Sequence, residues 1–305
     1  METPKKEMLL THVAKDFSSL ASGYRFGPEM LFANIPWQLA YRKTENQAVG
    51  VYLFCRRPKT DENWSVATNV TIRFLSVNGK EWSIDFHYVF ANDSEFLSYG
   101  CTFNSWDILL KDYVVDDSLV FEIKATIGSI TGIEKPDVLR DFNASSAFTD
   151  VALKVGEKKF FVSKVYLATQ SENFKTLLFG GFKEANQAEV ELKEVDPEAF
   201  QIFLELIYME NTLTDSNIED VLVLVDKYHA KNPARVCEEF LINNSNHCIR
   251  TKLRIAAQYN FKALKDHCLN KLTCRAEIRA VLGVSATGLD PSICAALLEK
   301  SLSLK

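Results

Sequence analysis

The side chains of this sequence best suited to chemistry are thiols and imidazoles near its end. Both groups bind zinc in proteins. Their spacing matches no zinc framework, and each falls on a segment with helical periodicity, where cysteine is commonly a buried packing residue. We therefore expect no metal and no other cofactor. The residues in question are Cys237, His247, Cys248, His267, Cys268 and Cys274.

Sequence patterns of known catalytic sites are missing as well. The chain has no GxSxG, no HExxH, no glycine-rich phosphate loop and no Walker pattern. We expect that the protein is not an enzyme. A catalytic site assembled in space from distant residues, among them the five histidines, stays an alternative.

Charge and hydropathy narrow the classes of partner. The net charge of -5 and the lack of a basic stripe argue against nucleic-acid binding, because phosphate binding needs surplus lysine and arginine on one face. The longest apolar run, Val221 to Val225, is too short to span a membrane. The segment Met1 to Leu10 has no apolar stretch typical of a secretion signal. Seven scattered cysteines without a CxxC indicate reduced thiols, so we expect a cytoplasmic and/or nuclear protein.

The first 127 residues predict β-strands. Apolar and polar residues alternate over 50–55, 69–74 and 119–123, and turn signals such as Asn78-Gly79 separate such runs. Several short strands at this spacing predict an antiparallel β-sandwich. The tryptophans all fall in this half, where we expect most of them to be core residues: Trp37, Trp64, Trp82 and Trp106.

The pattern lapses over residues 128–143, around Gly132 and Pro136, which predicts a linker. Beyond it the sequence predicts a hairpin over 151–155 and 159–162, and a further short strand over 188–192.

Helices are expected to dominate this second half, which makes it an α+β domain that is mainly helical. Ser171 can cap a helix that ends at Gly180-Gly181, and Asp196-Pro197 has the pattern of another helix start. The helix after Pro197 has one apolar face, formed by Phe200, Phe203, Leu204 and Ile207.

Two stretches of this half resemble a BTB (POZ) domain. The first contains Phe148-Thr149-Asp150-Val151, Val155-Gly156, the run 160–167 and Ser171-Glu172-Asn173-Phe174, and the second is the run 190–200. The family pattern ends near Ile207-Tyr208 and the run 237–240. About a hundred residues therefore follow the family order.

The first half resembles a MATH (TRAF-like) domain over residues 7–127. Its matching residues, in family order, are Ile35-Pro36-Trp37, Leu53-Phe54-Cys55, Trp64, Asn78-Gly79, Tyr99-Gly100, Trp106-Asp107, Tyr113 and Asp116-Asp117-Ser118. The whole chain is similar to MATH–BTB substrate adaptors of cullin-3 ubiquitin ligases. This resemblance implies a MATH sandwich over 7–127, a linker over 128–143, a BTB/POZ domain over 144–242 and a C-terminal helical extension over 243–305.

The resemblance also implies a homodimer. In the BTB family an aspartate before the first strand and a basic residue that opens the first helix lie together at the dimer interface, and Asp150 and Lys164 hold those positions. Two solvated charges at the ends of a strand and a helix are the alternative. The family often has histidines where this chain has Phe161 and Ser163, although Ser163 can still cap the helix.

A cullin-3 contact is implied by Phe182-Lys183-Glu184, which matches the family's hydrophobic-x-Glu element. Phe182 would fill a groove on cullin-3 and Glu184 would fix the orientation. The alternative is a Phe182 ring that folds back onto its own domain. The helical run 243–271 either widens the cullin platform or only packs.

The substrate groove of MATH domains binds short extended peptides. The resemblance places Tyr88, Tyr99, Gly100 and Cys101 along it. Family members often have tryptophan and phenylalanine where this chain has Tyr99 and Cys101. The resemblance therefore does not determine whether this chain binds the same class of peptide as those members.

Two functions follow from these patterns. The first is a substrate-specific cullin-3 adaptor that holds peptide segments of target proteins. The second is a dimeric interaction scaffold or transcription-linked BTB protein that never binds cullin.

Overall fold

The computed structural model describes residues 6–44, 48–60, 63–76, 80–133, 139–181, 187–210, 212–283 and 289–304. Its internal contacts divide the chain into two compact units. Residues 1–135 and 245–305 form the first unit, and residues 136–244 form the second. The C-terminal helices thus belong to the same unit as the N-terminal strands.

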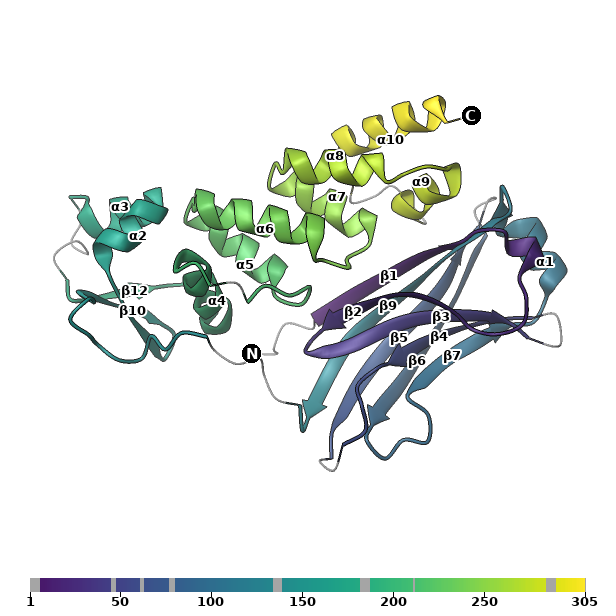
Figure 1. Ribbon diagram of the computed structural model, residues 1–305, viewed down its shortest axis with the longest axis horizontal. Coiled ribbons are helices and arrows are strands. Elements are labelled where there is room, and N and C mark those ends of the chain that lie inside the picture. The colour runs from purple at the N-terminus through teal and green to yellow at the C-terminus, as the bar shows by residue number, and fades with distance from the viewer. Residues whose placement is uncertain are drawn as a thin grey trace. The chain divides into compact units, whose positions relative to one another are not determined.

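The first unit contains an antiparallel β-sandwich, as the sequence predicts (Figure 1). One sheet has the strand order β1-β9-β5-β6, with β8 paired to β9, and the other has the order β2-β3-β4-β7. The strands are β1 (Lys6–Ala14), β2 (Arg25–Phe32), β3 (Ile35–Lys43), β4 (Val49–Cys55), β5 (Ser65–Leu75), β6 (Glu81–Ala91), β7 (Ser98–Phe103), β8 (Val114–Val115) and β9 (Ser118–Thr131). A 3-10 turn (Phe17–Ser19) and α1 (Trp106–Asp112) lie between strands.

Aromatic side chains fill the space between the two sheets. Trp37 and Trp64 are fully buried, and the indole of Trp37 donates a hydrogen bond to the carbonyl of Phe32 (3.1 Å). Trp82 and Trp106 pack against the same core from its margin. The expectation that most tryptophans are core residues is confirmed.

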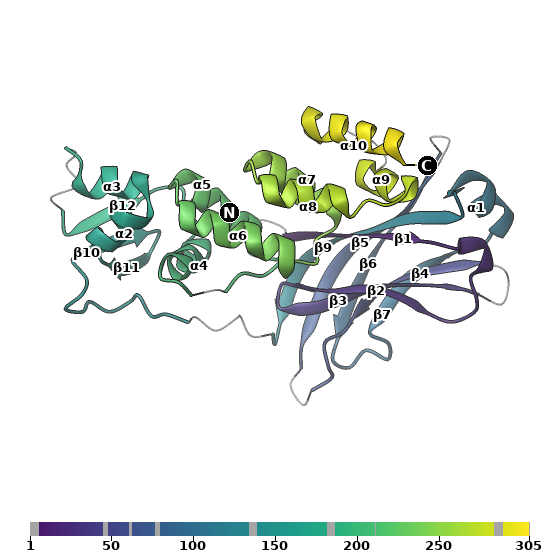
Figure 2. The same cartoon turned by 45° about the horizontal axis from the view of Figure 1, so that its top comes forward.

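Helices α7 to α10 complete the first unit, and α9 packs against β1 and β9 (Figure 2). They are α7 (Ile249–Gln258), α8 (Lys262–Asn270), α9 (Arg275–Leu282) and α10 (Pro291–Ser303). Ala276 and Ala280 lie in a buried cluster with Leu75 and Val120 of the sandwich. The Glu277 carboxylate also binds the Lys15 ammonium at 2.7 Å.

The second unit combines a small sheet with helices. Its strand order is β11-β10-β12, with β10 antiparallel to β11 and parallel to β12. The strands are β10 (Val151–Val155), β11 (Lys158–Val162) and β12 (Glu189–Leu192), and the helices are α2 (Lys164–Gln170), α3 (Glu172–Phe179), α4 (Pro197–Ile207), α5 (Ile218–Lys227) and α6 (Lys231–Asn243). This confirms the predicted hairpin and mainly helical α+β class.

Helix starts in this unit follow the capping residues of the sequence. The hydroxyl of Ser171 accepts a hydrogen bond from the amide of Phe174, and the Asp196 carboxylate accepts from the amides of Glu198 and Ala199. The face of α4 predicted to be apolar is buried, and the ring of Phe203 lies near Tyr228 of α5's C-terminal cap (5.6 Å between centroids).

The segment 128–143, expected to be a linker, is part of folded structure at both of its ends. Strand β9 continues to Thr131, which is four residues into the range 128–143. At the other end, Phe142 is buried, and its carbonyl accepts a hydrogen bond from the amide of Phe161 (2.8 Å). Both ends of the expected linker therefore belong to folded units, and the chain passes between the units a second time after Asn244.

A half-buried histidine makes the sandwich sensitive to acid. His12 of β1 lies between Tyr41 and Phe121, with ring centroids 5.2 and 5.6 Å away. Burial lowers its pKa from 6.5 to about 4, because the charged imidazolium is poorly solvated there.

We predict that the sandwich loses stability as the pH falls from about 6.5 to about 4. In this window the unfolded chain binds a proton at His12 that the folded chain rejects, so the loss is about 3 kcal/mol. Urea unfolding followed by tryptophan fluorescence measures this unit alone, because all four tryptophans lie in it. The difference between wild type and His12→Gln should shrink toward acid pH. A difference that does not change with pH contradicts the prediction.

Candidate binding site

Aromatic side chains lie where the two sheets meet at their edges, at the position where the peptide groove is expected; we call this surface, around Phe86, Tyr88 and Tyr99, the groove. Among the described residues, β6 pairs only with β5 and β7 only with β4, so each is an edge strand. Tyr88 of β6 and Tyr99 of β7 stack across this junction, with ring centroids 4.3 Å apart and planes 22° apart. The structure therefore brings together two of the residues expected in the groove.

The groove is open to solvent along an apolar rim. The Tyr99 side chain is 40% exposed, and its ring lies 4.8 Å from that of Phe86. Ile84 and Phe96 are exposed nearby in the chain, and the Tyr88 hydroxyl donates a hydrogen bond to the carbonyl of Phe96 (3.3 Å). Such a strip can hold apolar side chains of an extended segment, and an edge strand offers it backbone hydrogen bonds.

Gly100 is needed for close packing of β7 against β4. It faces Tyr52 in the ladder, and a Cβ at this position would lie 2.0 Å from the carbonyl oxygen of Val51 and 2.7 Å from the Cα of Tyr52. Gly100 thus positions the strand that carries Tyr99, and it does not itself line the groove with a side chain.

Cys101 is a packing residue of the same strand. It is partly buried and packs against the sandwich core. Burial raises the pKa of its thiol to about 12, so the thiol is neutral at physiological pH and is a poor nucleophile. In the groove it acts as a small apolar side chain.

In the second unit, the structure also brings together Asp150 and Lys164. The contact joins the Asp150 carboxylate to the backbone amide of Lys164 at 2.7 Å, and the Lys164 ammonium donates to the carbonyl of Gln187 (3.3 Å). Ser163 caps α2 as expected, because its hydroxyl accepts from the amide of Tyr166. Asp150 therefore helps to fix the start of α2.

Two apolar side chains near this pair face solvent. Phe148, just before β10, is 88% exposed, and Val165 on α2 is 60% exposed. Periodicity did not identify either residue, because Phe148 lies in a loop and Val165 is a single position on a short helix. An exposed phenylalanine of this kind is a typical anchor of a protein interface.

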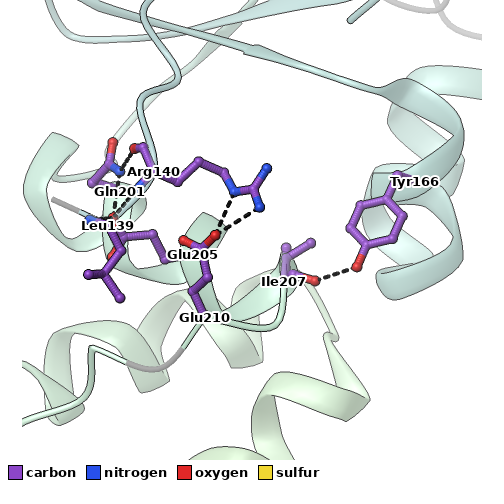
Figure 3. A network of polar contacts seen from close by, with 7 residues as sticks. All are labelled: Leu139, Arg140, Tyr166, Gln201, Glu205, Ile207 and Glu210. Atoms are coloured by element: carbon purple, nitrogen blue, oxygen red, sulfur yellow. Dashed lines mark hydrogen bonds and ion pairs between the residues drawn. The ribbon is translucent and has the colours of Figure 1, made fainter. Parts of the chain in front are cut away.

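A buried carboxylate holds the N-terminal segment of this unit to α4 (Figure 3). Glu205 is 1% exposed, and its Oε1 accepts hydrogen bonds from the amides of Leu139 and Arg140 and from the side chain of Gln201, at 3.1, 3.4 and 2.8 Å. Its Oε2 accepts from the hydroxyl of Thr212 (2.8 Å). These donors replace the water that the carboxylate loses on burial.

The same network continues to the surface. Arg140 donates from Nε and Nη2 to Glu210 at 3.0 and 2.8 Å, and the Tyr166 hydroxyl of α2 donates to the carbonyl of Ile207 (2.9 Å). Together these bonds tie α2 and the incoming chain to the end of α4.

Phe182 and Glu184, the residues expected to contact cullin-3, lie outside the described residues. The helix before them, α3, ends at Phe179 with Gly180 as its C-terminal cap, as the sequence predicts. Phe179 is itself 54% exposed.

Comparison with known proteins decides the family. Residues 14–127 match the model of the MATH domain, and residues 139–245 match that of the BTB/POZ domain. The chain is 36% identical to BTB and MATH domain-containing protein 15 of Caenorhabditis elegans over 278 residues, which cover 89% of this chain and 99% of that relative. The chain belongs to the BTB and MATH domain-containing proteins.

A second relative matches nearly the whole of the present chain. BTB and MATH domain-containing protein 45 of Caenorhabditis elegans is 26% identical, over 93% of this chain and 60% of that relative. Among solved structures, the BTB domain of zebrafish PATZ1 is 23% identical with a TM-score of 0.27, and the match covers 31% of this chain and 75% of that one. Both domains of this family are protein-interaction modules.

The thiols and imidazoles near the end of the chain do not converge on a metal site. Within the part of the chain that the structure describes, no group of three or more histidine, cysteine, aspartate or glutamate side chains could hold a metal ion. Over the same residues, no helix has the length and hydropathy needed to cross a bilayer. All seven cysteines are free thiols.

We predict that Gly100→Ala destabilises the sandwich by about 1–3 kcal/mol, because the added methyl group must push β7 away from β4. Urea unfolding followed by tryptophan fluorescence measures the change. Gly27→Ala is the matched control in the same unit, since a Cβ there would meet its nearest atoms at 3.5 Å or more, which is ordinary van der Waals contact. Equal stability of the Gly100 variant and wild type would show that β7 does not need this close approach.

Proposed function

We propose that this protein is a substrate-specific adaptor of a cullin-3 ubiquitin ligase. Its MATH domain holds an extended peptide of a target protein, and its BTB domain forms a homodimer and binds cullin-3. The observation that carries the proposal is the open aromatic groove between β6 and β7, in a chain that also contains a BTB domain.

In this role the protein performs no bond chemistry of its own. It holds the target near a ubiquitin-loaded enzyme and so raises the effective concentration of the reacting groups. A dimer presents two peptide grooves and two cullin sites, so a target with two matching segments is held longer. Free thiols fit a location in the cytoplasm or nucleus, where thiols stay reduced.

The peptide would bind along β7. Its backbone would pair with the open edge of that strand, and one apolar side chain would lie against Tyr99 and Phe86. Tyr88 supports this surface from behind, because it stacks on Tyr99 and contacts Phe90 edge to face, with 4.7 Å between the centroids of Tyr88 and Phe90.

The second copy of the chain would cover Phe148 and Val165. Burying a phenylalanine stabilises an interface by roughly 1.5–3 kcal/mol. In a symmetric dimer both subunits would contribute their copies of these side chains to the interface. Asp150 and Lys164 lie at the start of the same helix and would fix the register of the two subunits.

We predict that the protein is a dimer in solution and that Phe148→Glu makes it monomeric. Light scattering should give about 69 kDa for wild type, twice the chain mass of 34.6 kDa, because two copies bury these apolar residues. The matched control is Leu302→Glu, which changes an equally exposed residue on α10. A monomeric wild type at micromolar concentration contradicts the dimer.

We predict that the purified N-terminal region of cullin-3 binds wild type, and that Phe182→Ala weakens binding about 10-fold to 100-fold. The loss corresponds to removing one buried aromatic ring from the interface. Glu184→Ala should weaken binding as well. Phe96→Ala removes an exposed phenylalanine from the other unit and serves as the control.

If wild type does not bind cullin-3, the second candidate holds: a dimeric scaffold whose MATH groove recruits a partner without ubiquitin transfer. The same titration decides between the two, because the dimer and the groove are common to both.

A further inference from the structure

A cavity of about 190 Å³ lies within the first unit, at the pair of sheet edges that does not form the groove. Among the described residues, β1 and β2 are edge strands of their sheets, as β6 and β7 are at the groove. Helix α9 and the start of α7 contribute further lining residues. The lining is mainly apolar and includes Leu10, Leu39, Ile249, Ala280 and Val281. We call this space the edge cavity.

A bulge in β2 shapes one wall of the edge cavity. The pairing of β2 with β3 shifts register after Phe26, so Gly27 and Pro28 together stand opposite the single residue Leu39. An extra residue of this kind bends its strand locally. Proline also lacks an N–H group, so this stretch is a poor template for a further strand. Gly27, Pro28 and Leu39 all line the cavity.

His12 of β1 is the polar side chain best suited to bind a ligand in the edge cavity. It lines the cavity, and none of the described residues forms a hydrogen bond with its ring nitrogens. A Cβ at Gly27 would lie 3.5 Å from Nδ1 of His12, so glycine places no side chain beside that nitrogen. Burial lowers the pKa of His12 to about 4. At neutral pH the ring is therefore uncharged and offers one donor and one acceptor.

The charged side chains that line the edge cavity are already engaged with the protein. The Glu277 carboxylate binds the Lys15 ammonium at 2.7 Å. Arg250 donates a hydrogen bond to the carbonyl of Leu282 (3.2 Å) and interacts electrostatically with the carboxylate of Glu122. A charged ligand would lose its water here and find charges that are already balanced, so the cavity favours a neutral ligand.

The volume of the edge cavity sets the size of the ligand. An apolar protein cavity of roughly 150 Å³ binds benzene. The edge cavity is somewhat larger, at about 190 Å³. It therefore has room for one six-membered ring and a small substituent, and it is too small for a peptide segment.

We propose that the edge cavity binds a small neutral aromatic compound with one hydrogen-bonding group, of the phenol class. The ligand ring would contact apolar side chains such as Leu39 and Val281, and its hydroxyl would bond to a ring nitrogen of His12. One ligand would then contact β1, β2 and α9, and its binding would stabilise the attachment of α9 to the sandwich. The proposal depends on neither cullin binding nor occupation of the groove.

The test begins with NMR titrations of the full chain at neutral pH. Phenol should bind with a dissociation constant on the order of 1 mM, the scale expected for about seven non-hydrogen atoms. It should shift the imidazole signals of one of the five histidines in a chain with isotope-labelled histidine. These signals should be the ones that are missing from His12→Phe, which identifies the residue at the site.

The role of the imidazole is tested by comparing phenol with toluene, which lacks the hydroxyl. Affinities measured from the ligand signals give a ratio for wild type and for His12→Phe. The ratio of phenol affinity to toluene affinity should fall about 3-fold to 10-fold in the variant, because only phenol loses a hydrogen bond. Gly27→Ala should lower the same ratio, since its methyl group would lie beside Nδ1.

Filling the edge cavity tests its position. Gly27→Leu should weaken binding of both compounds about 10-fold or more, because its side chain occupies the space of the ring. Leu31→Phe is the matched control: it enlarges an exposed residue of the same strand that is not part of the lining. Phenol should raise the thermal unfolding temperature of wild type and of this control, but not that of Gly27→Leu. Unchanged unfolding without ligand shows that each variant is folded.

Three results would overturn the proposal. One is a wild type whose His12 signals do not shift at roughly ten times the expected dissociation constant. Another is a folded Gly27→Leu that binds phenol as tightly as wild type. The third is benzoate that binds more tightly than phenol, which would assign the site to a carboxylate held by Arg250.

Discussion

Strand β7 lies so close to β4 that no side chain fits between them at Gly100. Strand β7 is the last strand of its sheet, and its residue Tyr99 lies next to Tyr88 on the edge of the other sheet. The groove exists because two edges meet there and leave aromatic rings partly uncovered. On the opposite side of the same sheet, the alternation of β4 places Tyr52 and Phe54 outward. One strand pairing therefore positions two surfaces of different chemistry.

The two surfaces differ in the side chains that form them. The groove is apolar along its rim, and it combines open backbone hydrogen-bonding groups with rings such as Tyr99. On the outward side of β4, Tyr52 and Phe54 pack edge-on against Tyr24, and the Arg56 guanidinium lies over the ring of Phe54.

The BTB domain depends on a different kind of constraint. Glu205 is a carboxylate inside the unit, and its four described donors come from the incoming chain, from α4 and from Thr212, which follows α4. Removal of such donors would leave a buried charge unsatisfied, so the network fixes where the chain enters the unit. Phe148 and the start of α2 come after this entry point in the chain. The exposed apolar residues Phe148 and Val165 lie on the segment that follows this entry.

Local pattern in the sequence determined much of this protein. Alternation predicted the sandwich, capping residues such as Ser171 and Asp196 predicted where helices begin, and the order of short motifs indicated both domains, because these signals act between neighbouring residues. Tertiary structure alone decided the rest. The end of the expected linker became part of the BTB unit through Glu205, about 65 positions away, and α9 joined the sandwich through Leu75, about 200 positions away. The rings of Tyr24 and Phe54 likewise meet only because β2, β3 and β4 pair side by side. Contacts of this kind leave no periodic signal, since the sequence separation between the partners is set by the path of the whole chain and not by the geometry of one element.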